Sequence, residues 1–152
     1  MATYNSSLII AGGGTAVPSI IPGTGRPVLG SISIASNTSF GTTDTLPLFY
    51  ISGPNAAHIV SFWFDFPALD GGAGLTLSLL DSLTTATTIL SASTVARAGG
   101  WVSQLNAAHA TIGPAITYQA NNLLYLKPAA SSTNTTGASA AVIYFGFEIA
   151  QD

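Results

Sequence analysis

The stretch SFWFDFPALDGGAGLTLSLLDS, from Ser61 to Ser82, contains two alternating runs on either side of a glycine-rich segment. The first run, extended back to residue 59, predicts a strand with two distinct faces. One face carries Val60, Phe62, Phe64 and Phe66, and the other carries Ile59, Ser61, Trp63 and Asp65. The second run alternates leucine with other residues from Leu75 to Leu80, and Asp70 followed by glycine is typical of a tight turn. The stretch therefore predicts a β-hairpin.

The same period-two alternation recurs along the chain and predicts an all-β domain. Short runs rich in β-branched and aromatic residues, separated by turn clusters, are typical of a sandwich or a barrel. Pro47 predicts an edge position for its strand, and a short helix of one or two turns is predicted over residues 93–100, ending at Gly99. The strands are predicted at residues 31–35, 45–52, 58–66, 75–80, 87–92, 122–128 and 142–150.

Residues 1–27 differ from the rest of the chain. The segment AGGGTAVPSIIPGTGRP contains five glycines and three prolines, which disfavour both a helix and a central strand. Six aliphatic residues make the region too apolar for a solvated tail, namely Leu8, Ile9, Ile10, Val17, Ile20 and Ile21. We therefore predict an extended N-terminal arm over residues 1–27, which lies on its own domain or on a neighbour, and a β-sandwich domain over residues 28–152.

Charge is scarce in this chain. Only 6% of its 152 residues are charged, with three Lys or Arg and a net charge of −3, whereas soluble domains average about 25% charged residues. Three cations cannot form the basic patch that nucleic-acid binding needs. A surface of Ser, Thr, Ala and Gly is poorly protected against association, which favours a subunit of an assembly.

No group of residues predicts catalysis or metal binding. The chain has no cysteine, and Asp65, Asp70 and Asp81 are too widely spaced for a calcium loop and suggest no carboxylate pair for glycoside hydrolysis. His58 and His109 have no potential ligand at metal-binding spacing, and no G-x-S-x-G motif is present. We expect no enzyme activity, metal or cofactor. MATYNSSLII lacks the features of a signal peptide, and the longest apolar run is too short for a membrane span, so we expect synthesis in the cytoplasm.

Two tryptophans and two tyrosines remain as candidate interface residues. Tyr125, Tyr144 and Trp63 alternate with buried-type residues and are predicted on outward strand faces, and Trp101 is the second tryptophan. Single exposed aromatic residues are common on free monomers. With so few charges around them, these four instead indicate a surface for protein contact.

The order of motifs from about residue 60 to residue 150 resembles that of head decoration, or cement, proteins of tailed bacteriophages. The resemblance rests on LDGGAGLTLSLLDS, ILSASTVARAGG and ITYQANNLLYLKPAASSTNTTGASAAVIYFGFEI. It implies a jelly-roll-like antiparallel β-sandwich that works as a homotrimer on the capsid surface, with the major capsid protein as its partner. It also implies a location in the virion. From the scarcity of cations and the short apolar run, we expect no nucleic-acid or membrane partner. The aromatic FWFDF strand and the long arm depart from the family pattern.

Two other functions fit the same residues. A carbohydrate-binding β-sandwich would use Trp63, Trp101 and the tyrosines as a stacking platform for sugar rings. A structural component of a tail or fibre would need the same uncharged surface as a decoration protein.

Overall fold

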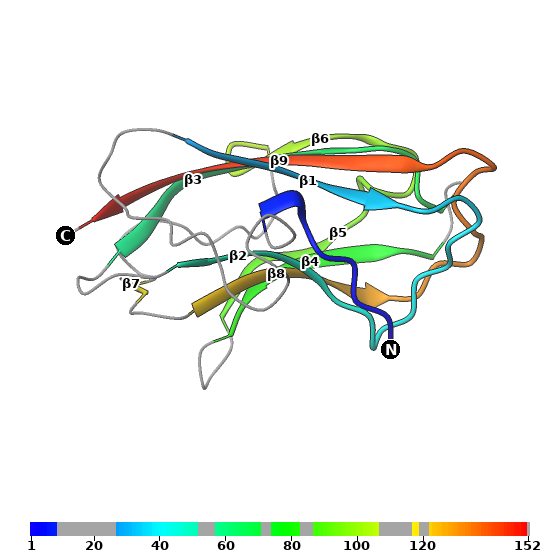
Figure 1. The fold of residues 1–152 in the computed structure, drawn as a ribbon, viewed down its shortest axis with the longest axis horizontal. Helices are drawn as coiled ribbons and strands as arrows, with labels where there is room; N and C mark the ends of the chain where they lie inside the picture. Colours follow the sequence, from blue (N-terminus) through cyan, green and yellow to red (C-terminus); the bar gives the residue numbers. More distant parts are fainter. Residues whose placement is uncertain are drawn as a thin grey trace.

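Nine strands form two sheets that pack face to face in the computed structural model, which describes residues 1–8, 27–51, 57–70, 74–82, 87–106, 117–118 and 122–151 (Figure 1). The strands are β1 (Val28–Ile34), β2 (Leu46–Ile51), β3 (Ala57–Phe66), β4 (Thr76–Asp81), β5 (Thr88–Ser93), β6 (Gly100–Ser103), β7 (Thr117–Tyr118), β8 (Asn122–Ala130) and β9 (Ala141–Gln151). Every strand that the sequence predicted is present among them.

The two sheets interleave strands that are distant in sequence. One sheet has the order β1-β9-β3-β6, with the short β7 paired to one end of β3, and the other has the order β2-β8-β4-β5. All pairings between these strands are antiparallel. Successive strands from β1 to β4 alternate between the sheets, which is the arrangement of a double-sheet jelly roll. The predicted jelly-roll-like β-sandwich is confirmed.

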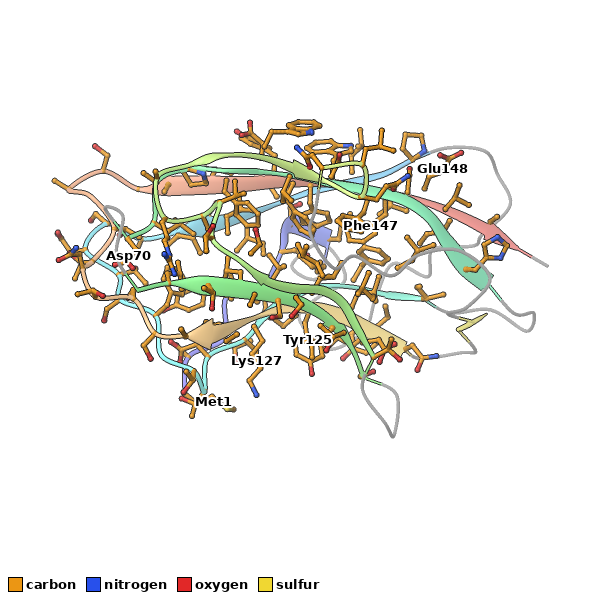
Figure 2. The ribbon with its side chains drawn as sticks, turned by 180° about the vertical axis from the view of Figure 1, so that it is seen from behind. Met1, Asp70, Tyr125, Lys127, Phe147 and Glu148 are labelled. Atoms are coloured by element: carbon orange, nitrogen blue, oxygen red, sulfur yellow. The ribbon has the colours of Figure 1, made fainter. Side chains whose placement is uncertain are left out.

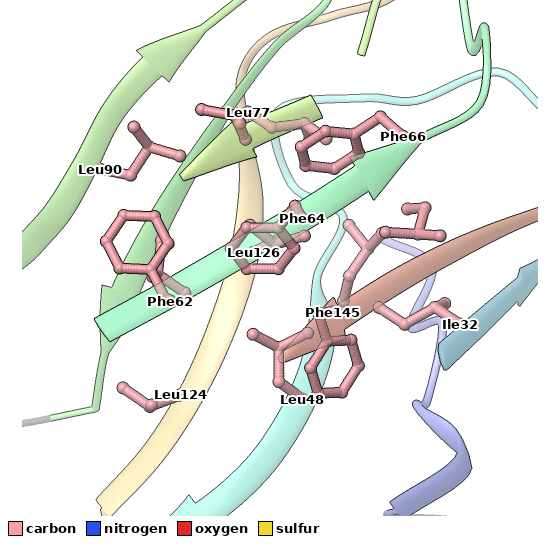
Figure 3. Packing of buried hydrophobic residues seen from close by; sticks show 14 of the residues in the cluster. Ile32, Leu48, Phe62, Phe64, Phe66, Leu77, Leu90, Leu124, Leu126 and Phe145 are labelled. Atoms are coloured by element: carbon pink, nitrogen blue, oxygen red, sulfur yellow. The ribbon is translucent and has the colours of Figure 1, made fainter. Parts of the chain in front are cut away.

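The core lies between the sheets and is rich in phenylalanine (Figure 3). Phe62, Phe64 and Phe66 of β3 are at most 2% exposed. Phe64 contacts Phe147 of β9 edge to face, with ring centroids 5.7 Å apart, a favourable geometry for aromatic pairs. The opposite sheet contributes leucines such as Leu77 and Leu126, which are fully buried.

The predicted hairpin over Ser61–Ser82 is wrong. β3 lies in the first sheet and β4 lies in the second, so the chain crosses the core between them. The phenylalanines of β3 and the leucines of β4 therefore face one another across the core and do not lie on neighbouring strands. The connection from Pro67 to Leu75 is also longer than the two-residue loops that tight hairpins favour.

The predicted two faces of β3 are wrong at one end of the strand. Ile59 is fully buried, whereas Val60 is 37% exposed. The cause is a β-bulge, because Ile59 pairs with Ile149 and Ser61 pairs with Glu148, which leaves Val60 as an extra residue. Beyond the bulge the predicted alternation holds.

Residues 94–99 form a hydrogen-bonded turn in place of the predicted helix, and the strand β6 follows it. Gly99 and Gly100 have φ values of +84° and +146°, which side-chain-bearing residues rarely adopt. This turn sets β6 antiparallel to β3, with Trp101 opposite Asp65. The sequence did not predict β6, which brings Trp101 into the sheet.

Asp70 ties together loops at one end of the sandwich, where Figure 2 shows it. Its buried carboxylate accepts four backbone N–H groups, from Gly74 and Leu75 after the crossing and from Thr133 and Asn134 in the β8–β9 loop. That loop is bonded in turn to the β1–β2 connection, where the Ser132 N–H donates to the Phe40 carbonyl at 2.9 Å. Asp70 therefore has a structural role.

The first eight residues lie along the edge of the second sheet. The Tyr4 N–H donates to the Thr45 carbonyl at 2.9 Å, and the Ser6 N–H donates to the Pro47 carbonyl at 3.1 Å. The Ser7 hydroxyl accepts the N–H of Ser31 in β1, so the segment also reaches the first sheet. Pro47 predicted that its strand lies at the edge of a sheet. That edge, on β2, is covered by residues 1–8 of the same chain.

Candidate functional site

The outer face of the β1-β9-β3-β6 sheet carries two exposed aromatic side chains, Trp101 and Tyr144. Trp101 is 52% exposed and Tyr144 is 51% exposed. We call this surface the tryptophan face. It comprises Leu29, Ser61, Trp63, Asp65, Trp101, Tyr144, Gly146 and Glu148.

The two tryptophans stack on one another on this face. Their ring centroids are 4.7 Å apart, and their planes differ by only 9°. Trp63 lies over Gly146 of β9, because a methyl group there would be 2.3 Å from the indole Nε1 atom. Trp63 is therefore enclosed between backbone and Trp101, and Trp101 presents its outer surface to solvent.

Next to the stack is a depression of about 270 Å³, lined by Pro27, Ser61, Trp63, Phe147 and Glu148. The Ser61 hydroxyl donates to the Glu148 carboxylate at 3.2 Å. Figure 2 shows Glu148 on the outer side of the sheet and Phe147 pointing toward the core. The depression thus combines an aromatic edge with an exposed carboxylate.

Tyr125, another predicted interface residue, lies on the opposite side of the molecule. It is half-buried on β8 beside Lys127, and both point away from the core (Figure 2). A second depression of about 300 Å³ lies on this side, lined by Thr42, Ser78, Leu80, Lys127, Pro128 and Ala129. Three of the four predicted aromatic residues thus share one face, and Tyr125 belongs to another.

Six aliphatic residues of the arm were predicted to contact its own domain or a neighbour. Five of them lie outside the described residues, namely Ile9, Ile10, Val17, Ile20 and Ile21. Leu8 is described, and it packs partly buried against the core of its own domain. The contact between the arm and a neighbour, and the division of the chain at residue 27, stay predictions.

The titratable residues that the structure describes do not assemble into a metal centre. No three His, Asp or Glu side chains come together within these parts of the chain. Asp81 is buried and its carboxylate accepts the Thr87 N–H at 2.8 Å, and His109 lies outside the described residues. In the same parts of the chain, no helix has the length and hydropathy of a membrane span.

We expect Gly146→Ala to separate the two stacked tryptophans, because the added methyl group displaces the Trp63 indole. The near-ultraviolet circular dichroism of the coupled indoles should weaken, and the free energy of unfolding should fall by about 1 to 2 kcal/mol. Gly137→Ala is the matched control, since its added methyl group meets no atom within 4 Å. An unchanged spectrum in Gly146→Ala would contradict the stacked arrangement.

Comparison with known proteins gives matches at the level of structure. No family model matches the chain, and no curated protein matches it. A chain in the solved capsid of Ralstonia phage GP4 is similar to it, with 23% identity and a TM-score of 0.60 over 96% of this chain and 97% of that one. A chain in the capsid asymmetric unit of cyanophage Pam1 is also similar, with 19% identity and a TM-score of 0.52 over 88% of this chain and 94% of that one. The chain therefore shares its fold, almost from end to end, with chains found in phage capsids.

Proposed function

We propose that this protein is a structural component of a bacteriophage virion, which binds the outer surface of the assembled capsid and stabilises it as a decoration, or cement, protein. The observation that carries the proposal is the near end-to-end structural match to chains in two phage capsids. The tryptophan face supports it, because exposed aromatic side chains gathered on one sheet face favour a protein partner.

Capsid stabilisation follows from mass action. A protein that binds only the assembled capsid lowers the free energy of that state by RT ln(1 + [L]/Kd). Several weak contacts made by one trimer reinforce one another through their high effective concentration. We therefore propose a homotrimer that bridges neighbouring capsomers.

Bridging requires more than one contact surface, and the sandwich offers two outward faces. In the proposal, the tryptophan face contacts the major capsid protein. The face around Tyr125 contacts a neighbouring copy. Among the described residues of β2, β8, β4 and β5, Lys127 is the one exposed charged residue, because Asp81 of β4 is buried. The protein would then reside on the capsid surface of the virion.

A carbohydrate-binding module is the second candidate, and one observation favours it. The solvent-facing ring of Trp101 is flat, half exposed and stacked on a second indole. Sugar rings could stack on such a platform, with nearby carboxylates accepting bonds from hydroxyl groups. This function predicts binding to purified glycans in the absence of any capsid.

Co-sedimentation with capsids that lack the protein tests the proposal. Wild-type protein should sediment with them, and Trp101→Ala should weaken binding tenfold or more, because exposed tryptophans dominate many interfaces. Leu105→Ala is the control. Leu105 is 91% exposed in the turn after β6, so this substitution also removes a large apolar side chain, but from outside the sheet face. Absence of wild-type protein from the capsid pellet would refute the proposal.

A further inference from the structure

Trp101, Asp65 and Tyr144 stand in one row across three strands of the tryptophan face. Asp65 of β3 pairs directly with Trp101 of β6 on one side and with Tyr144 of β9 on the other. Directly opposed residues on one face of a sheet have Cβ atoms about 5 Å apart. An exposed carboxylate therefore stands between two half-exposed aromatic side chains.

The charges on this face have one sign. Asp65 and Glu148 are the acidic residues of β1, β9, β3 and β6, and those four strands contain no Lys or Arg. Among the described residues, Arg97 lies in the turn before β6, where its Nε donates to the Leu75 carbonyl at 2.8 Å, and Lys127 lies on the other sheet. No cation of these parts of the chain neutralises Asp65 from within the face.

An apolar partner would cover Asp65 without neutralising it. Removing a carboxylate from water is costly unless an opposite charge accompanies it. An arginine fits both the aromatic rings and the carboxylate of the row. Its planar guanidinium stacks on an aromatic ring while its N–H groups pair with a carboxylate. Charge complementarity therefore selects a basic surface as the partner.

We propose that the row of Trp101, Asp65 and Tyr144 receives an arginine side chain of the capsid protein, which stacks on the Trp101 ring and pairs with the Asp65 carboxylate. This inference rests on the proposed function and specifies the chemistry of its contact. Glu148 lies outside the row, because it is four positions beyond Tyr144 along β9, a distance of about 13 Å. Salt at physiological strength screens exposed charges over about 8 Å.

Binding to capsids that lack the protein, measured at several salt concentrations, tests the inference with matched charge variants. Asp65→Asn should weaken binding tenfold or more and reduce its dependence on salt. Glu148→Gln, which removes the same charge from the same face, should weaken it less than threefold. Equal effects of the two substitutions, or no effect of Asp65→Asn, would overturn the inference while leaving capsid binding intact.

Intrinsic fluorescence of the isolated protein provides a second readout, because both tryptophans of the chain belong to the stack. N-acetyl-arginine amide should change the emission, its uncharged citrulline analogue should not, and Asp65→Asn should abolish the response. An arginine response in a protein that fails to bind capsids would support the arginine site and refute the capsid as its source. A response to glucose, galactose or mannose with none to arginine would overturn the inference in favour of a carbohydrate platform.

Discussion

Asp70→Asn is expected to lower the free energy of unfolding by about 3 kcal/mol, more than any surface substitution in the domain. One carboxylate oxygen accepts the N–H groups of Gly74 and Leu75 at 2.7 and 2.6 Å. The other accepts those of Thr133 and Asn134 at 2.8 and 2.6 Å. An asparagine amide has a single acceptor oxygen, so its NH₂ group must face two backbone donors. Urea denaturation at pH 7 measures the loss.

The Asp70 carboxylate also makes the free energy of unfolding depend on pH. Burial raises the pKa of Asp70, but the N–H groups of Asn134, Leu75, Gly74 and Thr133 together outweigh burial and hold the pKa below its usual value. Such a group stabilises the fold fully above the unfolded-state pKa of about 3.9, and this stabilisation is lost as pH falls through the folded-state pKa. Stability should therefore decline below about pH 4, less steeply in Asp70→Asn than in wild type.

Asp65→Asn is the control for this substitution, because it makes the same chemical change at an exposed position. It should alter the free energy of unfolding by no more than about 0.5 kcal/mol. Equal stability of the two variants would show that Asp70 does not hold the β3–β4 and β8–β9 loops together.

Removal of residues 2–7 is expected to destabilise the domain by about 2 to 4 kcal/mol. Tyr4 is partly buried and packs against Phe40 with ring centroids 5.4 Å apart. Full burial of a large side chain contributes about 1.5 to 3 kcal/mol, so this contact supplies part of that range. Ser6 is fully buried, and its hydroxyl donates to the Leu48 carbonyl. The Ala2 N–H donates to the Asp44 carboxylate at 2.5 Å, and the bonds from Gly41 and Ala2 lower the pKa of Asp44.

Thermal unfolding of the truncated protein measures this effect, and two substitutions locate it. Tyr4→Ala should reproduce most of the loss. Thr3→Ala should have little effect, because Thr3 is exposed and its hydroxyl makes only a long contact of 3.4 Å with that of Thr45. A truncated protein as stable as wild type would mean that residues 2–7 are a dispensable tail.

The alternation in the sequence predicted the strands well, because burial on one side of a strand imposes a period of two. The alternating apolar residues lie in the core in three stretches, Phe62 to Phe66, Leu75 to Leu79 and Phe145 to Ile149. Alternation does not show which strands pair. The hairpin that it predicts over Ser61–Ser82 is therefore wrong, because the two strands face one another across the core. The bulge at Val60 left no signal of its own.

The candidate site was predicted only in part. Trp63 and Tyr144 were expected on outward faces because they alternate with buried phenylalanines, and the structure places them there. Their contact with Trp101 could not be predicted, because β6 is only four residues long and begins at the second of two glycines with positive φ. The role of Gly146, which makes room for the Trp63 ring, was not predicted either. This role follows from the pairing of Gly146 with Trp63, and the sequence does not show which strands pair.

The central claim is that the protein sits on the capsid and bridges its subunits, and a cryo-electron microscopy reconstruction of particles assembled with the protein tests it most directly. We predict density for the two-sheet domain on the outer surface of the shell, in groups of three, with the tryptophan face against capsid subunits and each group spanning neighbouring capsomers. A shell that carries no such density, or density confined to the tail, would contradict the claim.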